Sequence, residues 1–186
     1  MTKKLFTILG IVLGLALVVL FLAVGVYGVG QIHIPTGAMA PTIPPDSRLL
    51  TEARTSPQPG DIILFWHQES SGPVRYIKRL IAIGGQRVQI KGDCYVYVDG
   101  QRLWDDAFNH PNHPNPQRQC YSQAGEMFSE EWLVPQGKFF VLGDNTNSSL
   151  DSRYFSFIDE KDYIGKPWFM LSPRFGPMNG YFGSAR

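Results

Sequence analysis

The sequence predicts a mainly β fold, with a single N-terminal transmembrane helix followed by an antiparallel β-rich domain. Two observations predict it. One is a long uncharged apolar run near the N-terminus, and the other is a series of short apolar or alternating runs, separated by Gly and Pro, in the rest of the chain. A chain of 186 residues has room for one medium-sized domain and such a helix. We expect a helix at residues 5–30 and the domain at residues 31–186.

The apolar run is long enough to cross a membrane. No charged side chain occurs from Leu5 to Gly30, and Leu5–Val29 is almost wholly apolar. As a helix this run measures roughly 37 Å, against a hydrocarbon core of about 30 Å. The alternative, a cleaved secretory signal, has an apolar core of only about 7–15 residues. The sequence therefore favours an uncleaved transmembrane anchor.

The charges that flank the run predict its orientation. Lys3 and Lys4 precede it, and no charge follows it until Asp46. Because basic residues remain on the cytoplasmic side, residues 1–4 are expected to be cytoplasmic and residues 31–186 exported. This indicates a single-pass protein of the inner (plasma) membrane, exposed on the periplasmic or extracellular side; a thylakoid membrane also fits.

The exported part reads as a set of short strands. Turns rich in Gly, Pro and Asp separate these strands, and they lie at residues 57–60, 84–85, 91–93 and 99–100. Asp99-Gly100 inside Val98–Arg102 predicts a hairpin. The expected strands are Asp61–Trp66, Arg79–Ile83, Arg87–Ile90, Cys94–Asp99 and Lys138–Leu142.

The segment at about 104–131 is expected to be a loop-rich surface excursion. It has few aliphatic residues and contains the run Asn109–Pro116, which is broken by prolines. His110 and His113 lie in this run without a set of Cys, His or carboxylate residues at ligand spacing, so we expect no metal site. No cofactor is indicated.

The two cysteines, Cys94 and Cys120, are expected to form a disulfide if the domain is exported to an oxidising compartment; a cytosolic domain would leave them reduced. The formal net charge is only +1 and the sequence has no basic run, so nothing in the charge pattern indicates nucleic-acid binding.

Three stretches carry a family resemblance: Ile34–Ile43, Tyr76–Ile81 and Gly143–Arg153. Together, and in this order, they resemble the motifs of bacterial type I signal peptidases (leader peptidases, peptidase family S26), which are membrane-bound serine proteases with a Ser/Lys dyad. In the family the first stretch reads roughly Pro-Ser-Gly-Ser-Met-x-Pro-Thr, and its second serine is the nucleophile. Here Ala38 occupies that position, and an alanine methyl group cannot attack a carbonyl.

The second stretch supplies the base. A serine hydroxyl needs a neighbouring base to take its proton. A lysine can do this only if it is uncharged near neutral pH, which requires burial among apolar groups. Lys78 lies in the expected strand Val74–Ile83, which is rich in aliphatic residues, and the resemblance makes it the general base.

The resemblance also implies an oxyanion hole and a substrate pocket. The backbone N–H of Ala38 and the hydroxyl of Thr36, where the family more often has serine, would donate hydrogen bonds to the oxyanion. Gly37 permits the tight backbone between them. Apolar side chains beside these groups would form the small pockets for the Ala-x-Ala residues before a cleavage site: Ile34, Pro35, Met39, Tyr76 and Ile77.

The third stretch would support the base. By resemblance, Ser149 donates a hydrogen bond that fixes the amine of Lys78. Asp151 and Arg153 are two residues apart, so on a strand they would share a face, and the family's pair forms an ion bridge. Gly143, Asp144 and Asn145 complete this support. The chain departs from the family at Thr146, where arginine is usual, and at residues 84–86, which read Gly-Gly-Gln in place of Pro-Gly-Asp.

The resemblance implies a membrane-anchored serine endopeptidase that removes signal peptides from exported preproteins after small-x-small sites. Its partners would be these preproteins and the lipid bilayer. With Ala38 the chain should bind substrate without cutting it, either as a deliberately inactivated mutant or as a natural pseudoenzyme that binds precursors. The retained Lys78, Ser149 and Asp151 favour the first. A conjugation-type pilin-processing peptidase is an alternative; a self-cleaving repressor is disfavoured because no DNA-binding helices are indicated.

Overall fold

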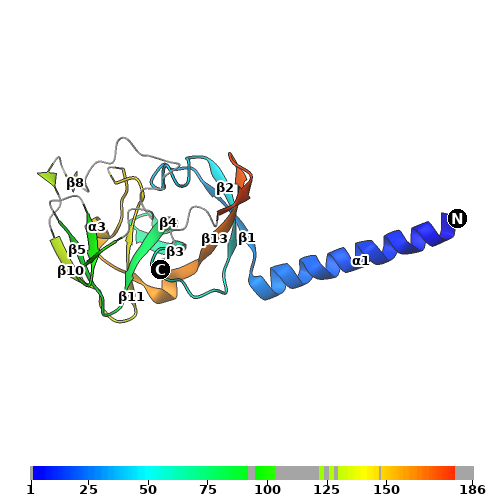
Figure 1. Ribbon diagram of the computed structural model, residues 1–186, viewed down its shortest axis with the longest axis horizontal. Helices are drawn as coiled ribbons and strands as arrows, with labels where there is room; N and C mark the ends of the chain where they lie inside the picture. Colours follow the sequence, from blue (N-terminus) through cyan, green and yellow to red (C-terminus); the bar gives the residue numbers. More distant parts are fainter. Residues whose placement is uncertain are drawn as a thin grey trace.

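A computed structural model describes residues 2–91, 95–103, 122–123, 126–127, 130–146 and 148–178. It confirms the mainly β fold class: one long N-terminal helix, α1, is followed by a domain of antiparallel sheets (Figure 1). The helix projects away from the domain as a separate rod (Figure 1). Cys94, Cys120, His110 and His113, named above for a disulfide and for the metal question, lie outside the described residues.

Helix α1 (Thr2–Tyr27) is apolar on all sides and makes the N-terminal element the sequence predicted. Its segment Lys4–Leu22 has a mean hydropathy of 3.0 and is long and apolar enough to cross a membrane. The helix ends before the expected boundary at residue 30. Gly28 follows it with a φ of 60°, a left-handed conformation that commonly ends helices, and Gly30 already begins the first strand.

The larger sheet forms most of the domain and is antiparallel throughout. Its strands lie in the order β1-β2-β13-β3-β4-β11-β12, with β14 paired to β13. The members are β1 (Gly30–Ile34), β2 (Ser47–Glu52), β3 (Ile62–Glu69), β4 (Gly72–Ile83), β11 (Lys138–Leu142), β12 (Ile158–Asp159), β13 (Tyr163–Ser172) and β14 (Gly176–Pro177).

The smaller sheet lies at the end of the domain away from α1, in the order β10-β5-β6-β7 (Figure 1). Asp99 and Gly100 have φ of 52° and 78°, the positive values of a type I′ turn, so the predicted hairpin is confirmed. Within the expected excursion at 104–131, the described residues 122–123, 126–127 and 130–131 belong to short strands, and the other residues lie outside the described ones. The members of the smaller sheet are β5 (Arg87–Ile90), β6 (Val96–Val98), β7 (Gln101–Arg102) and β10 (Glu130–Leu133). A separate two-stranded sheet consists of β8 (Ser122–Gln123) and β9 (Glu126–Met127).

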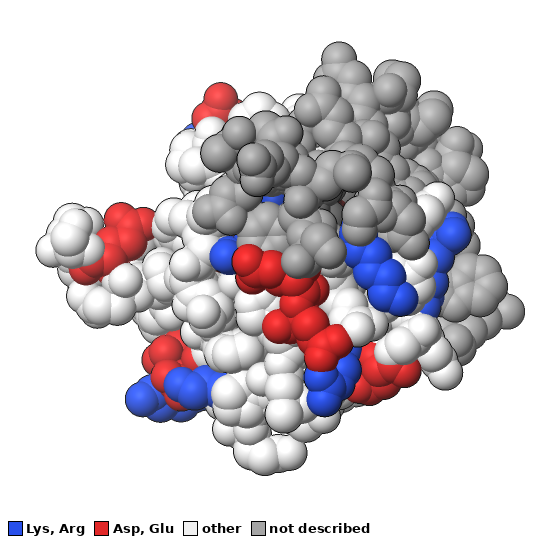
Figure 2. Space-filling view, turned by 90° about the vertical axis from the view of Figure 1, so that its left-hand side faces the viewer, with Lys and Arg blue, Asp and Glu red and all other residues white. Residues whose placement is uncertain are grey.

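Strand β3 and its partner β4 run through the centre of the large sheet, with apolar clusters on either face. Ile62 and Leu64 pack with residues of β1 and β2, while Ile63 and Phe65 pack with residues of β11 and β12. A third cluster joins the smaller sheet to Phe140 and Leu142. The hairpin is buried on both faces only at Ile62–Phe65 of β3 and Ile77–Ala82 of β4, and this buried part supports the side chains at its edge. On the small-sheet end, acidic and basic side chains lie among uncharged ones (Figure 2).

Two short helices complete the described domain: α3 (Ser152–Phe155) and the 3₁₀ helix η1 (Glu160–Asp162). The first follows the loop at residues 143–151, and its position holds that loop against the sheet. Ser152 accepts the backbone N–H of Val141 at 2.9 Å, so the start of α3 is tied to β11.

Candidate active site

The three motif stretches meet at one cavity of about 630 Å³. The first is the turn-rich segment between β1 and β2, the second is the largely buried part of β4 from Tyr76 to Ile81, and the third is the loop between β11 and α3. Ala38, Lys78 and Thr36 all line this cavity, as the motifs predicted for a nucleophile position, a base and an oxyanion donor. The remaining lining residues are Ile32, His33, Ile34, Pro35, Gly37, Glu69, Val74, Arg75, Tyr76, Ile77, Ser148 and Leu150.

Lys78 is held on β4 opposite Ile63 of β3 and is 5% exposed. Burial lowers its pKa from 10.5 to about 8; Asp151 and Asp144 oppose this shift, and Arg153 adds to it. Its amine lies 5.4 Å from the ring centroid of Tyr76. Among the described residues the amine has no hydrogen bond or ion pair. The amine therefore combines a low pKa with freedom to accept a proton.

Asn145 connects the third motif to the first. Its backbone N–H donates to the carbonyl of Ala38 at 3.1 Å, and its side-chain Nδ2 donates to the carbonyl of Gly37 at 3.0 Å. The Gly37 carbonyl also accepts the backbone N–H of Ala40 at 3.0 Å, closing a tight turn. The backbone at position 38 is thus fixed from two sides.

Ser149 is buried beside the same backbone. Its side chain is 7% exposed, and within the described part of the chain its Oγ has no hydrogen-bond partner. A Cβ built on Gly143 would lie 2.1 Å from Ser149 Oγ and 2.6 Å from the carbonyl oxygen of Ala38. The expected hydrogen bond from Ser149 to Lys78 is therefore not formed here, because the hydroxyl is packed against Gly143; its role towards Lys78 stays a proposal.

The Asp151–Arg153 ion pair forms as expected, but not on a strand. Asp151 is the N-cap of α3 and accepts the backbone N–H of Arg153, so capping rather than strand periodicity brings the two together. The guanidinium Nε lies 2.8 Å from the carboxylate, and both side chains are almost wholly buried. Asp151 also accepts the N–H of Gly143 at 3.0 Å, and Arg153 donates to the carbonyl of Thr146 at 2.9 Å. The pair holds the loop in shape.

Arg79 was not predicted as a site residue, although Asp144 was. Its side chain is 1% exposed and donates from Nε to Asp144 at 2.8 Å and from Nη1 to the carbonyl of Gly60 at 2.7 Å. An arginine between aliphatic strand residues is a signal for such a pair, since a buried charge is rarely left without an opposite one. This ion pair fixes the start of the third motif to the residue after Lys78.

Four of the five predicted pocket residues line the cavity: Ile34, Pro35, Tyr76 and Ile77. Met39 does not. It is wholly buried in the core cluster with Ile43 and Leu49, because the turn at residues 37–40 directs it inward. Ile32, Val74 and Leu150 contribute apolar walls that the sequence did not indicate.

One edge of β4 is open along the cavity. Residues Gly72–Arg79 of β4 pair with β3, whereas β11 covers the other edge only from Arg79 onward. In the described chain, backbone groups of residues 74–78 on this edge therefore have no neighbouring strand. An extended peptide that entered the cavity would meet a free strand edge beside Lys78.

Gly143→Ala should damage the site without touching the base. The new methyl group would overlap Ser149 and the Ala38 carbonyl, and overpacking of this kind costs about 1–3 kcal/mol in the free energy of unfolding. Denaturant unfolding in detergent measures the loss. Gly176→Ala is the matched control, since nothing lies within 4 Å of its Cβ position. Equal stability of the two variants would show that the contact at Gly143 is not tight.

Comparisons with known proteins agree with the motifs. Residues 4–171 match the family described as signal peptidase, peptidase S26. A probable signal peptidase I-1 of Synechocystis is 33% identical over 161 residues, which cover 80% of this chain and 75% of that protein. A signal peptidase I of Leptolyngbya laminosa is 31% identical over 172 residues, with 87% and 76% covered. A crystal structure of a signal peptidase I from Enterococcus faecalis is 30% identical, covers 60% of this chain and 97% of its own, and has a TM-score of 0.48.

Proposed function

The chain belongs to the signal peptidase family, peptidase S26, and we propose that it binds signal-peptide-bearing preproteins at a Ser/Lys-type site that Ala38 leaves unable to cut. The main observation in support is that Ala38 and the buried Lys78, whose pKa is lowered, line the same cavity. An oxygen on residue 38 would complete a serine endopeptidase.

The retained groups have assignable roles in that chemistry. With serine at position 38, its hydroxyl oxygen would attack the scissile carbonyl carbon while its proton passes to Lys78, which then protonates the leaving amine. The backbone N–H of residue 38 and the Thr36 hydroxyl would donate to the oxyanion. In the described structure, Ala38 N–H has no acceptor, so it is available for this.

Substrate would bind as an added strand. The open edge of β4 faces Ile32–Thr36 across the cavity, so an extended segment lying between them would place its scissile bond beside Ala38 and Lys78. The apolar side chains of Ile34 and Ile77 lie where the small residues before the cleavage site would pack. The branched aliphatic side chains on the two sides of the cavity limit the room for large substrate side chains; they are Ile32, Ile34, Val74 and Ile77.

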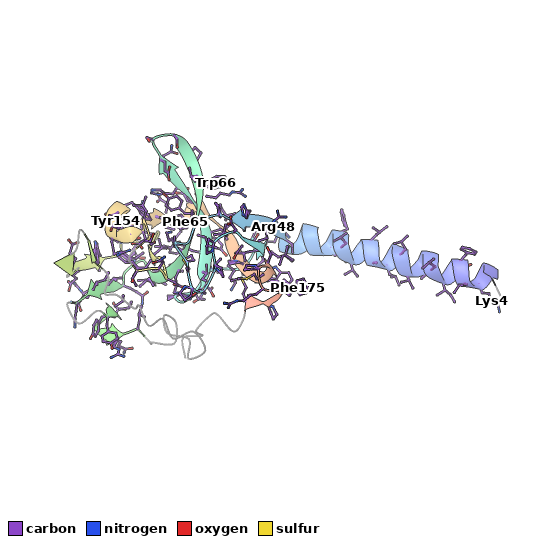
Figure 3. The ribbon with its side chains drawn as sticks, turned by 90° about the horizontal axis from the view of Figure 1, so that it is seen from above. Lys4, Arg48, Phe65, Trp66, Tyr154 and Phe175 are labelled. Carbon is purple, nitrogen blue, oxygen red and sulfur yellow. The ribbon has the colours of Figure 1, made fainter. Side chains whose placement is uncertain are left out.

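Helix α1 would anchor the protein in the inner (plasma) membrane, with Lys3 and Lys4 on the cytoplasmic side and the domain on the exported side. Lys4 lies at the free end of α1, and Arg48 and Phe175 lie near the end that joins the domain (Figure 3). Phe175 is 81% exposed and contacts the ring of Phe169, an apolar surface suited to the membrane next to the anchor.

The Ala38 chain should form a stable, uncleaved complex with a secretory preprotein in detergent. Binding needs the cavity walls and strand edge, which the alanine leaves in place. Affinity is measured by pull-down of a labelled preprotein with alanine one and three residues before its cleavage site. The control preprotein carries large side chains at those two positions and should bind at least tenfold more weakly, which corresponds to about 1.4 kcal/mol. Equal binding of both would mean that the cavity at Ala38 does not recognise precursors.

A natural pseudoenzyme would give the same binding result. Its native coding sequence would carry alanine at position 38, whereas that of an inactivated enzyme would carry serine. The buried Lys78, whose amine makes no hydrogen bond or ion pair with the described residues, favours the second origin, because a buried lysine costs stability.

A further inference from the structure

The peptide unit between Gly37 and Ala38 carries the backbone N–H that the proposed function assigns to the oxyanion. Its carbonyl oxygen belongs to Gly37 and its N–H to Ala38, and in a trans peptide the two point in opposite directions. A group that holds the carbonyl therefore also sets the direction of the N–H. Two donors hold this carbonyl: the backbone N–H of Ala40 and Nδ2 of Asn145, both at 3.0 Å.

Of these two donors, only Asn145 comes from a different part of the chain. It lies 108 residues away in the sequence, at the motif that also carries Asp144 and Ser149. Its own backbone N–H donates to the carbonyl of Ala38 at 3.1 Å. Two successive carbonyls of the nucleophile loop are thus held by one residue. Rotation of the 37–38 peptide would break the bonds that the Gly37 carbonyl accepts from Asn145 Nδ2 and from the Ala40 N–H.

We propose that Asn145 is a positioning residue that orients and polarises the 37–38 peptide, so that the N–H of residue 38 is a stronger and better directed oxyanion donor. A hydrogen bond accepted by a peptide carbonyl strengthens the bond donated by the N–H of the same peptide, since such chains are cooperative. The bond from Nδ2 would therefore act through the peptide on the transition state. It does not touch the substrate, and it leaves Lys78 unaffected. This inference rests on the proposed function.

The first test needs no catalysis. Gly37-Ala38 is the only Gly-Ala pair in the sequence, so the full chain in detergent, labelled with ¹³C in glycine carbonyls and ¹⁵N in alanine, gives one correlated signal. Asn145→Asp keeps the side-chain shape and loses the Nδ2 donor. Losing the bond should move the Gly37 ¹³C and Ala38 ¹⁵N resonances upfield. Gln101→Ala, an exposed amide lost from the other sheet, should leave both in place. An unmoved signal in Asn145→Asp would overturn the inference.

The second test uses the Ala38→Ser enzyme. Asn145→Asp in that background should lower kcat roughly tenfold, less than the 10²–10³ for removing a direct oxyanion donor, while KM changes less than twofold. In Asn145→Leu, which loses the donor without adding a charge near Lys78, the pH at which activity is half-maximal should not move. Combined with Thr36→Ala, the losses should be less than additive if both act on one oxyanion. An unchanged kcat, or a loss carried by KM, overturns the inference. If Ala38→Ser itself does not cleave, the proposed function fails, and the resonance test alone decides the role of Asn145.

Discussion

Replacing Ala38 with serine is expected to turn the chain into an endopeptidase that cleaves a secretory preprotein after a small-x-small site. The residues proposed for the other roles are in place: Lys78, the proposed base, lines the same cavity as residue 38 and Thr36, the proposed oxyanion donors. Loss of the nucleophile costs a serine protease on the order of 10⁶-fold in kcat, so the gain should be of that order. Incubation in detergent, with mass spectrometry of both fragments, identifies the cleaved bond.

The control for this gain is a second substitution. Ala38→Ser combined with Lys78→Met should be as inactive as the original chain, because methionine fills a similar volume and cannot take a proton. Asp159→Asn, at an exposed ion pair with Lys138, should leave the gain intact. An Ala38→Ser protein that stays inactive on several preproteins would support the pseudoenzyme, and a double variant that still cleaves would exclude Lys78 as base.

Asp144→Ala is expected to be the most destabilising substitution near the site. It would leave the Arg79 guanidinium buried without its carboxylate, and breaking a buried pair in this way costs about 3–5 kcal/mol in the free energy of unfolding. Denaturant unfolding of the full chain in detergent gives the value. The matched control is Glu131→Ala, which breaks an exposed pair with Arg87 and should cost about 1 kcal/mol or less.

A rescue variant tests the cause. Arg79→Met together with Asp144→Leu removes both charges and should recover much of the stability that Asp144→Ala loses, because apolar side chains can replace a buried pair. If the double variant is no more stable than Asp144→Ala, the loss comes from loop packing rather than from the stranded charge of Arg79.

The motifs predicted which segments of the chain come together at one cavity, because they resemble those of a known family. They did not predict the direction in which each side chain points. Met39 is as apolar as Ile34, and only the turn at residues 37–40 decides that it enters the core. Asp151 and Arg153 fit a strand face by spacing, yet an aspartate that caps a helix satisfies the same spacing. A residue type and a period do not distinguish these outcomes.

The pattern of apolar runs predicted the fold class, but it did not predict every strand. Strand β13 contains Gly165 and Pro167, and the register shifts on both sides of Phe169, so its sequence lacks a clean alternation. Arg79 went unnoticed because a charge in a strand normally reads as a surface residue. Pairing with β2 stabilises the irregular strand β13, and the ion pair with Asp144 stabilises the buried charge of Arg79.

The central claim is that Lys78 is a buried base whose uncharged form accepts the nucleophile's proton. The pH dependence of kcat/KM in the Ala38→Ser enzyme tests it most directly. A pKa lowered by burial to about 8 means that the amine is mostly charged below that pH. The rate should therefore rise about tenfold per pH unit up to about pH 8 and level off above it. A rate that is flat from about pH 6 to about pH 9, or one that falls as the amine loses its charge, would contradict the assignment of Lys78.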